Sequence, residues 1–529
     1  MSLPLHDRAV SGDAETLVRM TGTALADPEF SPEVVSLLIP QRSLEAGEQF
    51  RFHFNMTKCI GCRSCEVACN EQNGNPANIH WRRVGEIEGG VYPLTERHYL
   101  SIGCNHCLDA DCLKGCPVDA YTKDPLTGIV LHSADACIGC QYCVWNCPYS
   151  VPQFNEERGV VGKCDMCHGR LTDGLEPACV NACPEAAIEI EIVNMASWRE
   201  DYAAAESPGM PAASQTLSTT RITLPQRSAA KLERVDGGRV RPEHAHLSLV
   251  FMTALMQCAA GALILAATFH SASPLLLVFL LGITTFALNI SIFHLGRPAY
   301  AWRALKMWRR SWLSREVLLF GLFFGALTAS TAAACWNAYH PGALILLDLR
   351  LLLWSAVTLG LAGVTASAFI YLVAARPAWN MVHTPVDFVL SAGLLGATAL
   401  PVLLHLAAWA QNSLLHRSSA PSPGQSLARV TAAVTFLWLG NQALRIVRLN
   451  RSPLFEGRAS ASLLNTVDLR AVLITAFAGI VSVPILSLNE KPGAALAMSA
   501  LGILLTRYLF FVTVVPLNMA LTFVRAEQR

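Results

Sequence analysis

The chain has 529 residues, which is enough for two or more domains. Its formal net charge is +1, so no overall field attracts nucleic acid, and we expect no nucleic-acid partner. Hydrophobic residues make up 52% of the chain and charged residues only 15%, which is too apolar for an ordinary soluble protein. The part before about residue 240 is mixed and rich in cysteine, whereas the part after about residue 246 is a series of long apolar runs. The composition therefore indicates a cysteine-rich domain followed by a membrane part.

Residues 1–58 are expected to form an N-terminal extension. Residues 13–20 and 32–40 have the composition of short helices, and residues 50–55 alternate as a strand does. Two interpretations of the first forty residues stay open: a poorly ordered arm, or an arm that docks on a partner subunit. Residues 1–20 contain no basic n-region, apolar h-region or twin arginine, so no export signal is visible in them.

Sixteen cysteines fall into four groups of four. The groups are Cys59, Cys62, Cys65, Cys69; Cys104, Cys107, Cys112, Cys116; Cys137, Cys140, Cys143, Cys147; and Cys164, Cys167, Cys179, Cys183. The first and third have the spacing C-x2-C-x2-C-x3-C, in which three close thiolates hold one [4Fe–4S] cluster and the fourth reaches a neighbouring cluster. A proline follows the last cysteine of three groups, as in bacterial ferredoxins. Sixteen thiolates are enough for four such clusters.

Three other uses of these cysteines compete with this one. A disulfide framework suits a short secreted domain rather than a chain of this length. Zinc sites use two separated C-x2-C pairs, and a third cysteine only three residues further on would crowd a tetrahedral ion. Unrelated structural cysteines would not cluster in four groups of four. The spacing therefore favours iron–sulfur clusters.

Four cysteine groups make two pairs, so residues 59–195 are expected to form a doubled ferredoxin-like module of the α+β class. In such duplications the first group usually pairs with the fourth and the second with the third. The expected ligand sets are Cys59/Cys62/Cys65/Cys183, Cys164/Cys167/Cys179/Cys69, Cys104/Cys107/Cys112/Cys147 and Cys137/Cys140/Cys143/Cys116. Strands are expected at residues 129–132 and 188–193.

Several short motifs in this module carry a family resemblance. They are Asn105-His-Cys, Cys116-Pro-Val-Asp-Ala-Tyr, Cys137-Ile-Gly-Cys-Gln-Tyr-Cys, Cys147-Pro-Tyr and Lys163-Cys-Asp-Met-Cys. Over about residues 50–195 the chain resembles the four-cluster electron-transfer subunit of dimethyl-sulfoxide-reductase-type molybdoenzymes. Some relatives replace one cysteine and hold a three-iron cluster. This sequence keeps all sixteen, so the resemblance implies four [4Fe–4S] clusters.

Residues 196–245 are small, polar and punctuated by proline, which predicts an extended basic linker. Residues 246–520 contain eight apolar runs, each near the ~20 residues needed to cross ~30 Å of hydrocarbon. The runs are 246–268, 274–296, 314–338, 352–374, 385–409, 427–447, 469–488 and 494–517. A soluble helical core is the alternative, but eight such runs in succession argue against it. We expect an all-α eight-helix transmembrane bundle, followed by a cytoplasmic tail at 521–529.

Lysine and arginine predict the orientation of this bundle. With eight spans both ends lie on one face, which carries the basic linker and the basic loops at 297–315 and 445–458. The opposite face carries only Arg350, Arg417 and Lys491. Because basic loops stay in the cytoplasm, we expect a multi-pass protein of the bacterial inner membrane, in contact with its lipids, with the iron–sulfur domain on the cytoplasmic side.

Short motifs in the apolar part resemble the eight-helix membrane anchor of the same enzymes. They are His294-Leu-Gly-Arg-Pro298, Ser311-Trp-Leu-Ser-Arg-Glu316, Arg376-Pro-Ala-Trp379 with Thr384-Pro-Val-Asp-Phe388, and Arg507-Tyr-Leu-Phe510. In that family the two subunits are usually separate polypeptides, whereas here they are fused. A histidine and a glutamate of the anchor serve its quinol site, so the resemblance implies these roles for His294 and Glu316.

The chemistry of the residues agrees with this assignment, because ionisable groups inside apolar spans are costly and tend to be functional. His294 and Glu316 flank one loop, and quinol oxidation needs a base near the ring; the alternatives are a helix cap for His294 and a structural ion pair for Glu316. Arg315, Asp387 and Arg507 are weaker candidates for the quinone site. Asp387 also suits a helix N-terminus, and Arg507 also suits snorkelling or an ion pair with Glu316 or Asp387.

Other polar residues in the spans suggest structural roles. His340 and His405 lie toward the other face, far from the clusters, and Cys258 and Cys335 are single packing residues. No two helices present histidines at matching depth, so we expect no haem.

We interpret the chain as a fused electron-transfer and anchor subunit of a respiratory molybdopterin oxidoreductase. Electrons would pass between the membrane quinone pool and a large catalytic subunit, and molybdopterin would be on that partner alone. Two alternatives remain open: a membrane quinone reductase fed by soluble ferredoxin, and an anchor and wire without quinone chemistry.

Overall fold

The computed structural model describes most of the chain. The described residues are 38–40, 42–225, 233–234, 240–340, 348–415 and 424–517. The helices expected near the N-terminus lie almost wholly, and the C-terminal tail wholly, outside these ranges.

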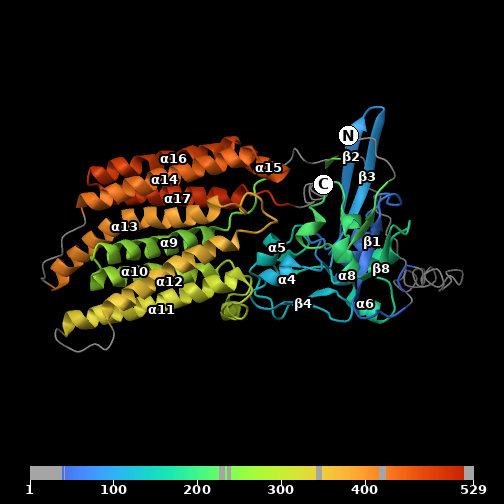
Figure 1. Cartoon of the computed structure of the whole chain (residues 1–529), viewed down its shortest axis with the longest axis horizontal. Helices are drawn as coiled ribbons and strands as arrows, with labels where there is room; N and C mark the ends of the chain where they lie inside the picture. The colour runs from blue at the N-terminus through green and yellow to red at the C-terminus, as the bar shows by residue number, and fades with distance from the viewer. Residues whose placement is uncertain are drawn as a thin grey trace, which may run out of the picture.

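Two bodies lie end to end along the long axis of the molecule (Figure 1). One is an α+β body, here called the cysteine module (residues 42–225), and the other is a body of long helices, here called the bundle (residues 247–512). This arrangement confirms the fold class expected from the sequence. The cysteine groups and the apolar runs therefore lie in separate bodies, which meet at a junction.

Small sheets build the cysteine module. In one of the two three-stranded sheets, β1 (Glu48–Asn55) pairs antiparallel with β8 (Ile188–Asn194) and parallel with β9 (Arg221–Thr223). Phe52 of β1 lies opposite Ile190 of β8, and both are buried, which is why these alternating sequences form strands. The other strands are β2 (Arg83–Val91), β3 (Leu94–Ile102), β4 (Tyr121–Lys123), β5 (Val130–His132), β6 (Gln153–Asn155), β7 (Val160–Gly162) and β10 (Glu233–Arg234).

Short helices follow or carry the cysteines. They are α3 (Ser64–Asn73), α4 (Asp111–Gly115), α5 (Tyr142–Asn146), α6 (His168–Thr172), α7 (Ala178–Asn181) and α8 (Met195–Glu200). The residues that precede α3, α5 and α6 are left-handed, with φ of 63° at Arg63, 59° at Gln141 and 50° at Cys167. Such residues turn the chain sharply, so that successive thiols of one group converge.

The segment expected to be an extended linker is packed into the cysteine module over its first part. Trp198 Nε1 donates a hydrogen bond to the Ser218 carbonyl at 2.9 Å, and Thr219 Oγ1 donates to the Asn105 carbonyl at 2.7 Å. Thr216, Thr219 and Thr220, which make this segment look like a surface connector, are buried. Thr220 Oγ1 donates to Asn105 Oδ1 at 2.8 Å, so these hydroxyl groups find partners in the second cysteine group.

Eight helices of the described chain are long and apolar enough to cross a membrane, as the sequence predicts. They are α9 (Leu247–Thr268), α10 (Pro274–Ile292), α11 (Trp312–Tyr339), α12 (Leu349–Ile370), α13 (His383–Leu415), α14 (Gly424–Asn450), α16 (Val467–Leu488) and α17 (Pro492–Val512). Two further short helices are not evident from hydropathy, η3 (Pro298–Leu305) and α15 (Phe455–Leu464).

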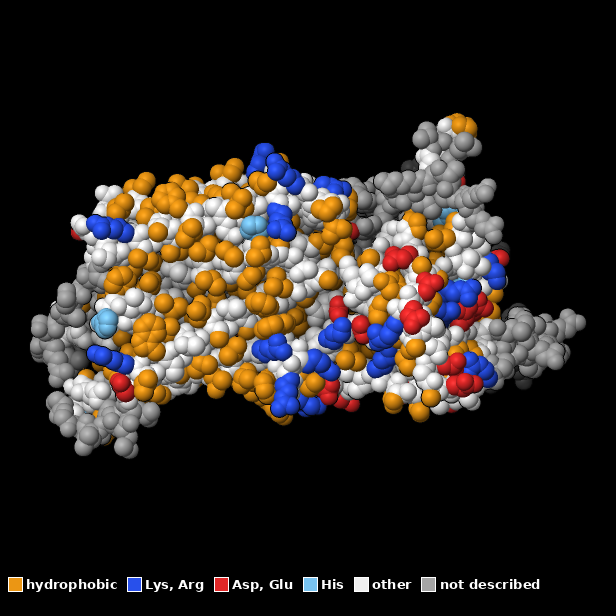
Figure 2. Space-filling model, in the orientation of Figure 1, with side chains coloured by type: hydrophobic (Ala, Val, Ile, Leu, Met, Phe, Trp, Pro, Cys, Tyr) orange, Lys and Arg blue, Asp and Glu red, His pale blue; other side chains and the backbone are white. Residues whose placement is uncertain are grey.

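Small residues allow the helices of the bundle to approach closely. A Cβ atom on Gly261 of α9 would lie 1.8 Å from the Ala392 carbonyl oxygen of α13, so these backbones touch directly. On α12, Gly363 packs against the ring of Phe320 from α11, and Gly360 packs against the ring of Phe323. On the face shown in Figure 2 the bundle is largely hydrophobic, and most of the Lys and Arg side chains visible on it lie toward the end that meets the cysteine module.

Candidate functional site

The fold brings distant cysteines together in four places. Three small cavities are lined by one set of thiols each: Cys59, Cys62, Cys65 and Cys183; Cys104, Cys107, Cys112 and Cys147; and Cys116, Cys137, Cys140 and Cys143. The remaining four, Cys69, Cys164, Cys167 and Cys179, influence one another electrostatically and so lie together. Each set therefore takes its fourth thiol from a different group, as in the nested pairing.

The chemistry of these thiols fits iron–sulfur clusters. All sixteen are free, and burial raises the pKa of Cys69, Cys140 and Cys147 to about 12. An isolated thiol in such surroundings stays protonated at neutral pH, whereas a bound metal stabilises the thiolate. Four converging thiols per site are the donor set of a [4Fe–4S] cluster, and of the sixteen only Cys62 is exposed.

Because each set takes its fourth cysteine from another group, the structure predicts which cluster that fourth cysteine binds. Replacing Cys116 with serine should damage the cluster of the third cysteine group, because Cys116 lines the cavity of Cys137, Cys140 and Cys143. Electron paramagnetic resonance (EPR) of the reduced protein would show which signal is lost or converted. Loss of the signal of the Cys104, Cys107 and Cys112 cluster instead would refute this assignment of Cys116.

Three buried side chains lie between neighbouring sites and reveal their order. Each interacts electrostatically with cysteines of two different sites. Tyr121 interacts with Cys143 and Cys112. Lys163 interacts with Cys104 and Cys164, and Arg82 interacts with Cys179 and Cys65. From the bundle outward we name the sites by their cysteines. They are the proximal site (Cys116, Cys137, Cys140, Cys143), the inner site (Cys104, Cys107, Cys112, Cys147), the outer site (Cys69, Cys164, Cys167, Cys179) and the distal site (Cys59, Cys62, Cys65, Cys183).

Three glycines join the proximal site to the bundle. Gly296 N donates to the Gly139 carbonyl at 3.3 Å, and Arg297 N donates to the Ile138 carbonyl at 3.1 Å. A Cβ atom on Gly296 would lie 2.2 Å from the carbonyl oxygen of Gly159, and one on Gly139 would lie 2.4 Å from the same oxygen. Because Gly139 lies between two cysteines of the proximal site and Gly296 follows His294 by two residues, this backbone contact holds the cysteine loop close to the histidine.

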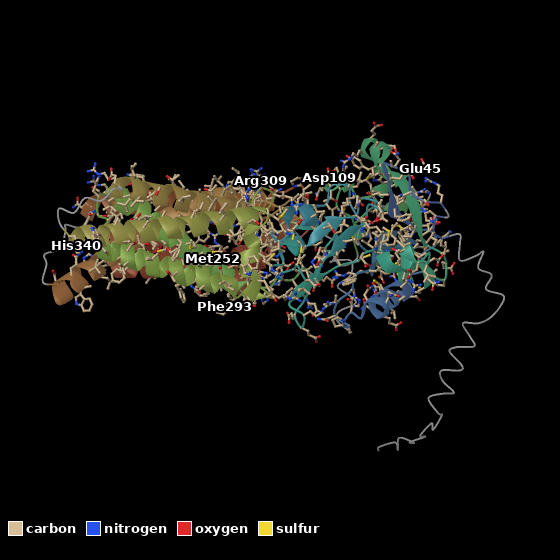
Figure 3. The ribbon with its side chains drawn as sticks, turned by 90° about the horizontal axis from the view of Figure 1, so that it is seen from below. Glu45, Asp109, Met252, Phe293, Arg309 and His340 are labelled. Carbon is tan, nitrogen blue, oxygen red and sulfur yellow. The ribbon has the colours of Figure 1, made fainter. Side chains whose placement is uncertain are left out.

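Polar contacts surround the glycine junction. Arg310 Nη2 lies 3.2 Å from Asp119 Oδ1, and Ser311 Oγ donates to the Gly115 carbonyl at 2.6 Å. Arg303 Nη1 donates to the Asp135 carbonyl at 2.9 Å. The basic loop between α10 and α11, whose charge predicts the orientation of the bundle, therefore also docks the cysteine module; Arg309 of this loop lies at the boundary (Figure 3).

A cavity of about 490 Å³ lies at this junction. The cysteine module contributes Ile138, Cys140, Tyr142 and Trp145, and the bundle contributes residues of α9, α10, η3, α11 and the end of α12. Its walls are mostly apolar, as is common for sites that bind small organic molecules. A cysteine of the proximal site, Cys140, thus forms part of the cavity wall.

His294 and Glu316 both line this cavity. His294 Nδ1 donates to the Ser291 carbonyl, which leaves Nε2 as the proton-accepting nitrogen. Glu316, on the first turns of α11, is 4% exposed, and within the described ranges no Lys, Arg or His nitrogen comes within 4 Å of its carboxylate. The structural ion pair considered for Glu316 is thus not seen there.

Two tyrosines and a tryptophan complete the site, and the sequence interpretation missed them. Tyr142 and Tyr371 lie close enough to Glu316 for an electrostatic interaction between each tyrosine and its carboxylate. Trp145 leaves the cysteine module and packs against Trp379 of the bundle, with ring centroids 5.4 Å apart. Tyr142 and Trp145 follow Cys140 closely in the chain, but nothing in their spacing indicates that they reach a membrane helix.

The weaker candidates lie elsewhere. Arg507 Nη1 lies 3.2 Å from Asp387 Oδ2, and Gln442 donates to the same carboxylate, so these residues form a buried network in the bundle. Arg315 points outward: its guanidinium donates to two loop carbonyls and covers the ring of Trp312. His340 lies at the end of the bundle remote from the cysteine module (Figure 3).

Comparisons with known proteins cover both bodies. The profile of the 4Fe-4S dicluster domain matches residues 95–192, and that of the DMSO reductase anchor subunit (DmsC) matches residues 243–510. A chain of the anaerobic dimethyl sulfoxide reductase of Haemophilus influenzae is 35% identical over 187 residues, which are 34% of this protein and 87% of that relative. A chain of a probable anaerobic dimethyl sulfoxide reductase of Escherichia coli K12 is 37% identical over 168 residues, 30% of this protein and 82% of the relative.

A third relative, a subunit of the sulfite dehydrogenase of Allochromatium vinosum, is 34% identical over 160 residues, 26% of this protein and 67% of the relative. The first two relatives are each covered over more than two thirds of their own length, and the anchor profile spans half of the chain. The chain therefore belongs to the dimethyl sulfoxide reductase family, and it joins an iron–sulfur electron-transfer domain and a DmsC-type membrane anchor in one polypeptide.

Proposed function

We propose that this chain relays electrons between a membrane quinol and a separate catalytic molybdopterin subunit, through four [4Fe–4S] clusters held by the sixteen cysteines. The observation that carries the proposal is the junction cavity, because a ligand of the proximal site, Cys140, lines the same space as His294 and Glu316. A molecule bound there would touch a proton acceptor and lie beside a one-electron carrier.

The residues of the cavity suit quinol oxidation. A quinol gives up two protons and two electrons when it becomes a quinone. Glu316 as the carboxylate and His294 through Nε2 would each accept a proton, and the apolar walls would hold the ring and the beginning of the isoprenoid tail. The clusters, when present, supply one-electron steps, and the two electrons would leave one after the other through the proximal, inner, outer and distal sites.

We further propose that the cysteine module lies on the cytoplasmic side of a bacterial inner membrane. The support is the gathering of Lys and Arg at the junction end of the bundle. A tag fused at residue 1 should be protected from membrane-impermeant reagents in intact cells and accessible after lysis. Labelling of the tag from the periplasm would overturn this orientation.

The partner is proposed to be a large subunit that carries molybdopterin. The relatives of the cysteine module are named as single chains of reductases and as one subunit of a dehydrogenase, which implies at least one further subunit in each enzyme. Purification in mild detergent, followed by partner identification and analysis for molybdenum or tungsten, tests this. A stoichiometric metal-bearing partner is the expected result.

The same purification separates the alternatives. A chain that purifies alone with its iron would favour a quinone reductase fed by soluble ferredoxin. Failure of quinone-site inhibitors to bind the purified complex would favour an anchor and wire without quinone chemistry.

A further inference from the structure

A buried arginine lies between the two sites that are farthest from the membrane. Arg82, just before β2, is 2% exposed, and its guanidinium covers the ring of Phe52 at 4.5 Å. No Asp or Glu oxygen lies within 4 Å of it in the described part of the chain. A buried charge without a counterion is costly, so such a residue needs a negatively charged neighbour of another kind.

The neighbours of Arg82 are cysteines of the outer and distal sites. Burial lowers the pKa of Arg82, but the thiolates of Cys179, Cys65 and Cys164 more than reverse this effect. Arg82 Nη1 donates to Ser101 Oγ at 3.2 Å, and Ser101 Oγ lies 3.4 Å from Cys65 Sγ. The guanidinium is therefore connected to a ligand of the distal site through one hydroxyl group.

Two donor atoms of the guanidinium remain free. Arg82 Nε and Nη2 are buried and have no hydrogen-bond partner among the described residues. Gly103 leaves the space beside Nη2 open, since a Cβ atom there would lie 3.3 Å from it. Buried N–H groups rarely stay unpaired in native proteins, which indicates that their acceptor is a group bound by the cysteines.

We propose that Arg82 is a redox-tuning residue that raises the reduction potentials of the outer and distal clusters and leaves those of the proximal and inner clusters unchanged. The inference rests on the proposed function, because it takes the sixteen cysteines as ligands of four clusters. Adding an electron makes a cluster more negative, so a fixed positive charge and N–H donors nearby favour the reduced form. Arginine stays charged at any ordinary pH, so the effect does not depend on titration.

Lys163 adds to this charge at the outer site. It is 4% exposed, and its Nζ donates to the Cys164 carbonyl at 2.7 Å. The outer site therefore has one buried cation on each side, whereas Tyr121, between the proximal and inner sites, is neutral. The outer cluster should have the highest potential of the four, which would draw electrons away from the membrane.

The test is a potentiometric titration of the full-length chain in its membrane, followed by EPR. In Arg82→Gln two of the four midpoint potentials should shift to more negative values, and in Arg82→Lys, which keeps the charge, the shift should be smaller. In Ser101→Ala, which interrupts only the connection to Cys65, one midpoint should shift. Arg97→Gln is the matched control, because Arg97 is a 54% exposed arginine of the β2–β3 hairpin.

Four unchanged midpoints in Arg82→Gln, or an equal shift of all four, would overturn the proposal. If Arg82→Gln does not retain its clusters, Arg82→Lys and Ser101→Ala decide: a single shifted midpoint in Ser101→Ala and a pair of near-normal midpoints in Arg82→Lys support it, and any other pattern overturns it. A wild-type titration that does not resolve four clusters would instead count against the proposed function, so the two failures are distinguishable.

Discussion

Replacing Glu316 with glutamine should reduce the rate of quinol-driven cluster reduction roughly 10²–10⁴-fold, the usual contribution of a positioned base. Glutamine keeps the shape of the side chain but accepts no proton from the quinol. The clusters should keep their EPR signals and their reduction by dithionite, because Glu316 lies in the bundle and not among the cysteines. Stopped-flow absorbance with a reduced quinone analogue would measure the rate.

Glu490→Gln provides the matched control, because Glu490 is an exposed glutamate in the turn that follows α16. Its rate should equal that of the wild type. Asp387→Asn serves as a second comparison: it disturbs the network with Arg507 and should affect the stability of the bundle before the quinol rate. An unaltered rate in Glu316→Gln would remove Glu316 from the proposed mechanism.

Replacing Gly296 with alanine should separate the proximal site from the junction cavity. The added Cβ atom would lie 2.2 Å from the Gly159 carbonyl oxygen, so the loop after α10 has to move away from the cysteine module. A displacement of about 1 Å at a reacting centre can cost roughly 10²-fold in rate, and we expect a loss of that order in quinol-driven cluster reduction. The cluster content and the dithionite-reduced spectra should stay normal.

Gly282→Ala is the control for this substitution. Gly282 lies in α10, the helix that precedes the same loop, but an added Cβ atom there meets no neighbouring atom. Its quinol-driven rate should be unchanged. If Gly296→Ala also retained the wild-type rate, the three-glycine contact would not position the cluster loop relative to His294.

Much of the molecule is predictable from local patterns in the chain. The eight apolar runs have the length and composition of membrane helices, and all eight are helices in the structure. The alternation in residues 50–55 and 188–193 marks β1 and β8, because one face of each strand must be buried. The sequence did not predict helices α15 and η3, since with 10 and 8 residues they are much shorter than the runs that can cross a membrane.

Composition says little about the tertiary partners of a polar residue, as two features of this chain show. The serines and threonines at 214–220 look like a surface linker, yet Thr216 Oγ1 lies 3.2 Å from Cys107 Sγ and contributes to the inner site. Asp387 and Arg507 form a buried ion pair, which is one of the two pairings expected for Arg507, and their role in the quinone site stays a prediction. In both cases the polar group is satisfied by a residue more than a hundred positions away.

By itself the sequence determined the two bodies, the cluster chemistry and the fusion, because cysteine spacing and apolar run length depend only on neighbours in the chain. Only the tertiary structure decided how the bodies meet. Neither Gly139 nor Gly296 can be recognised in the sequence as a contact residue. Their contact arises because backbones from two domains come within hydrogen-bond distance. The role proposed for Arg82 likewise depends on the cysteines that surround it, since the effect of a buried charge is set by its neighbours in space and not by its position in the chain.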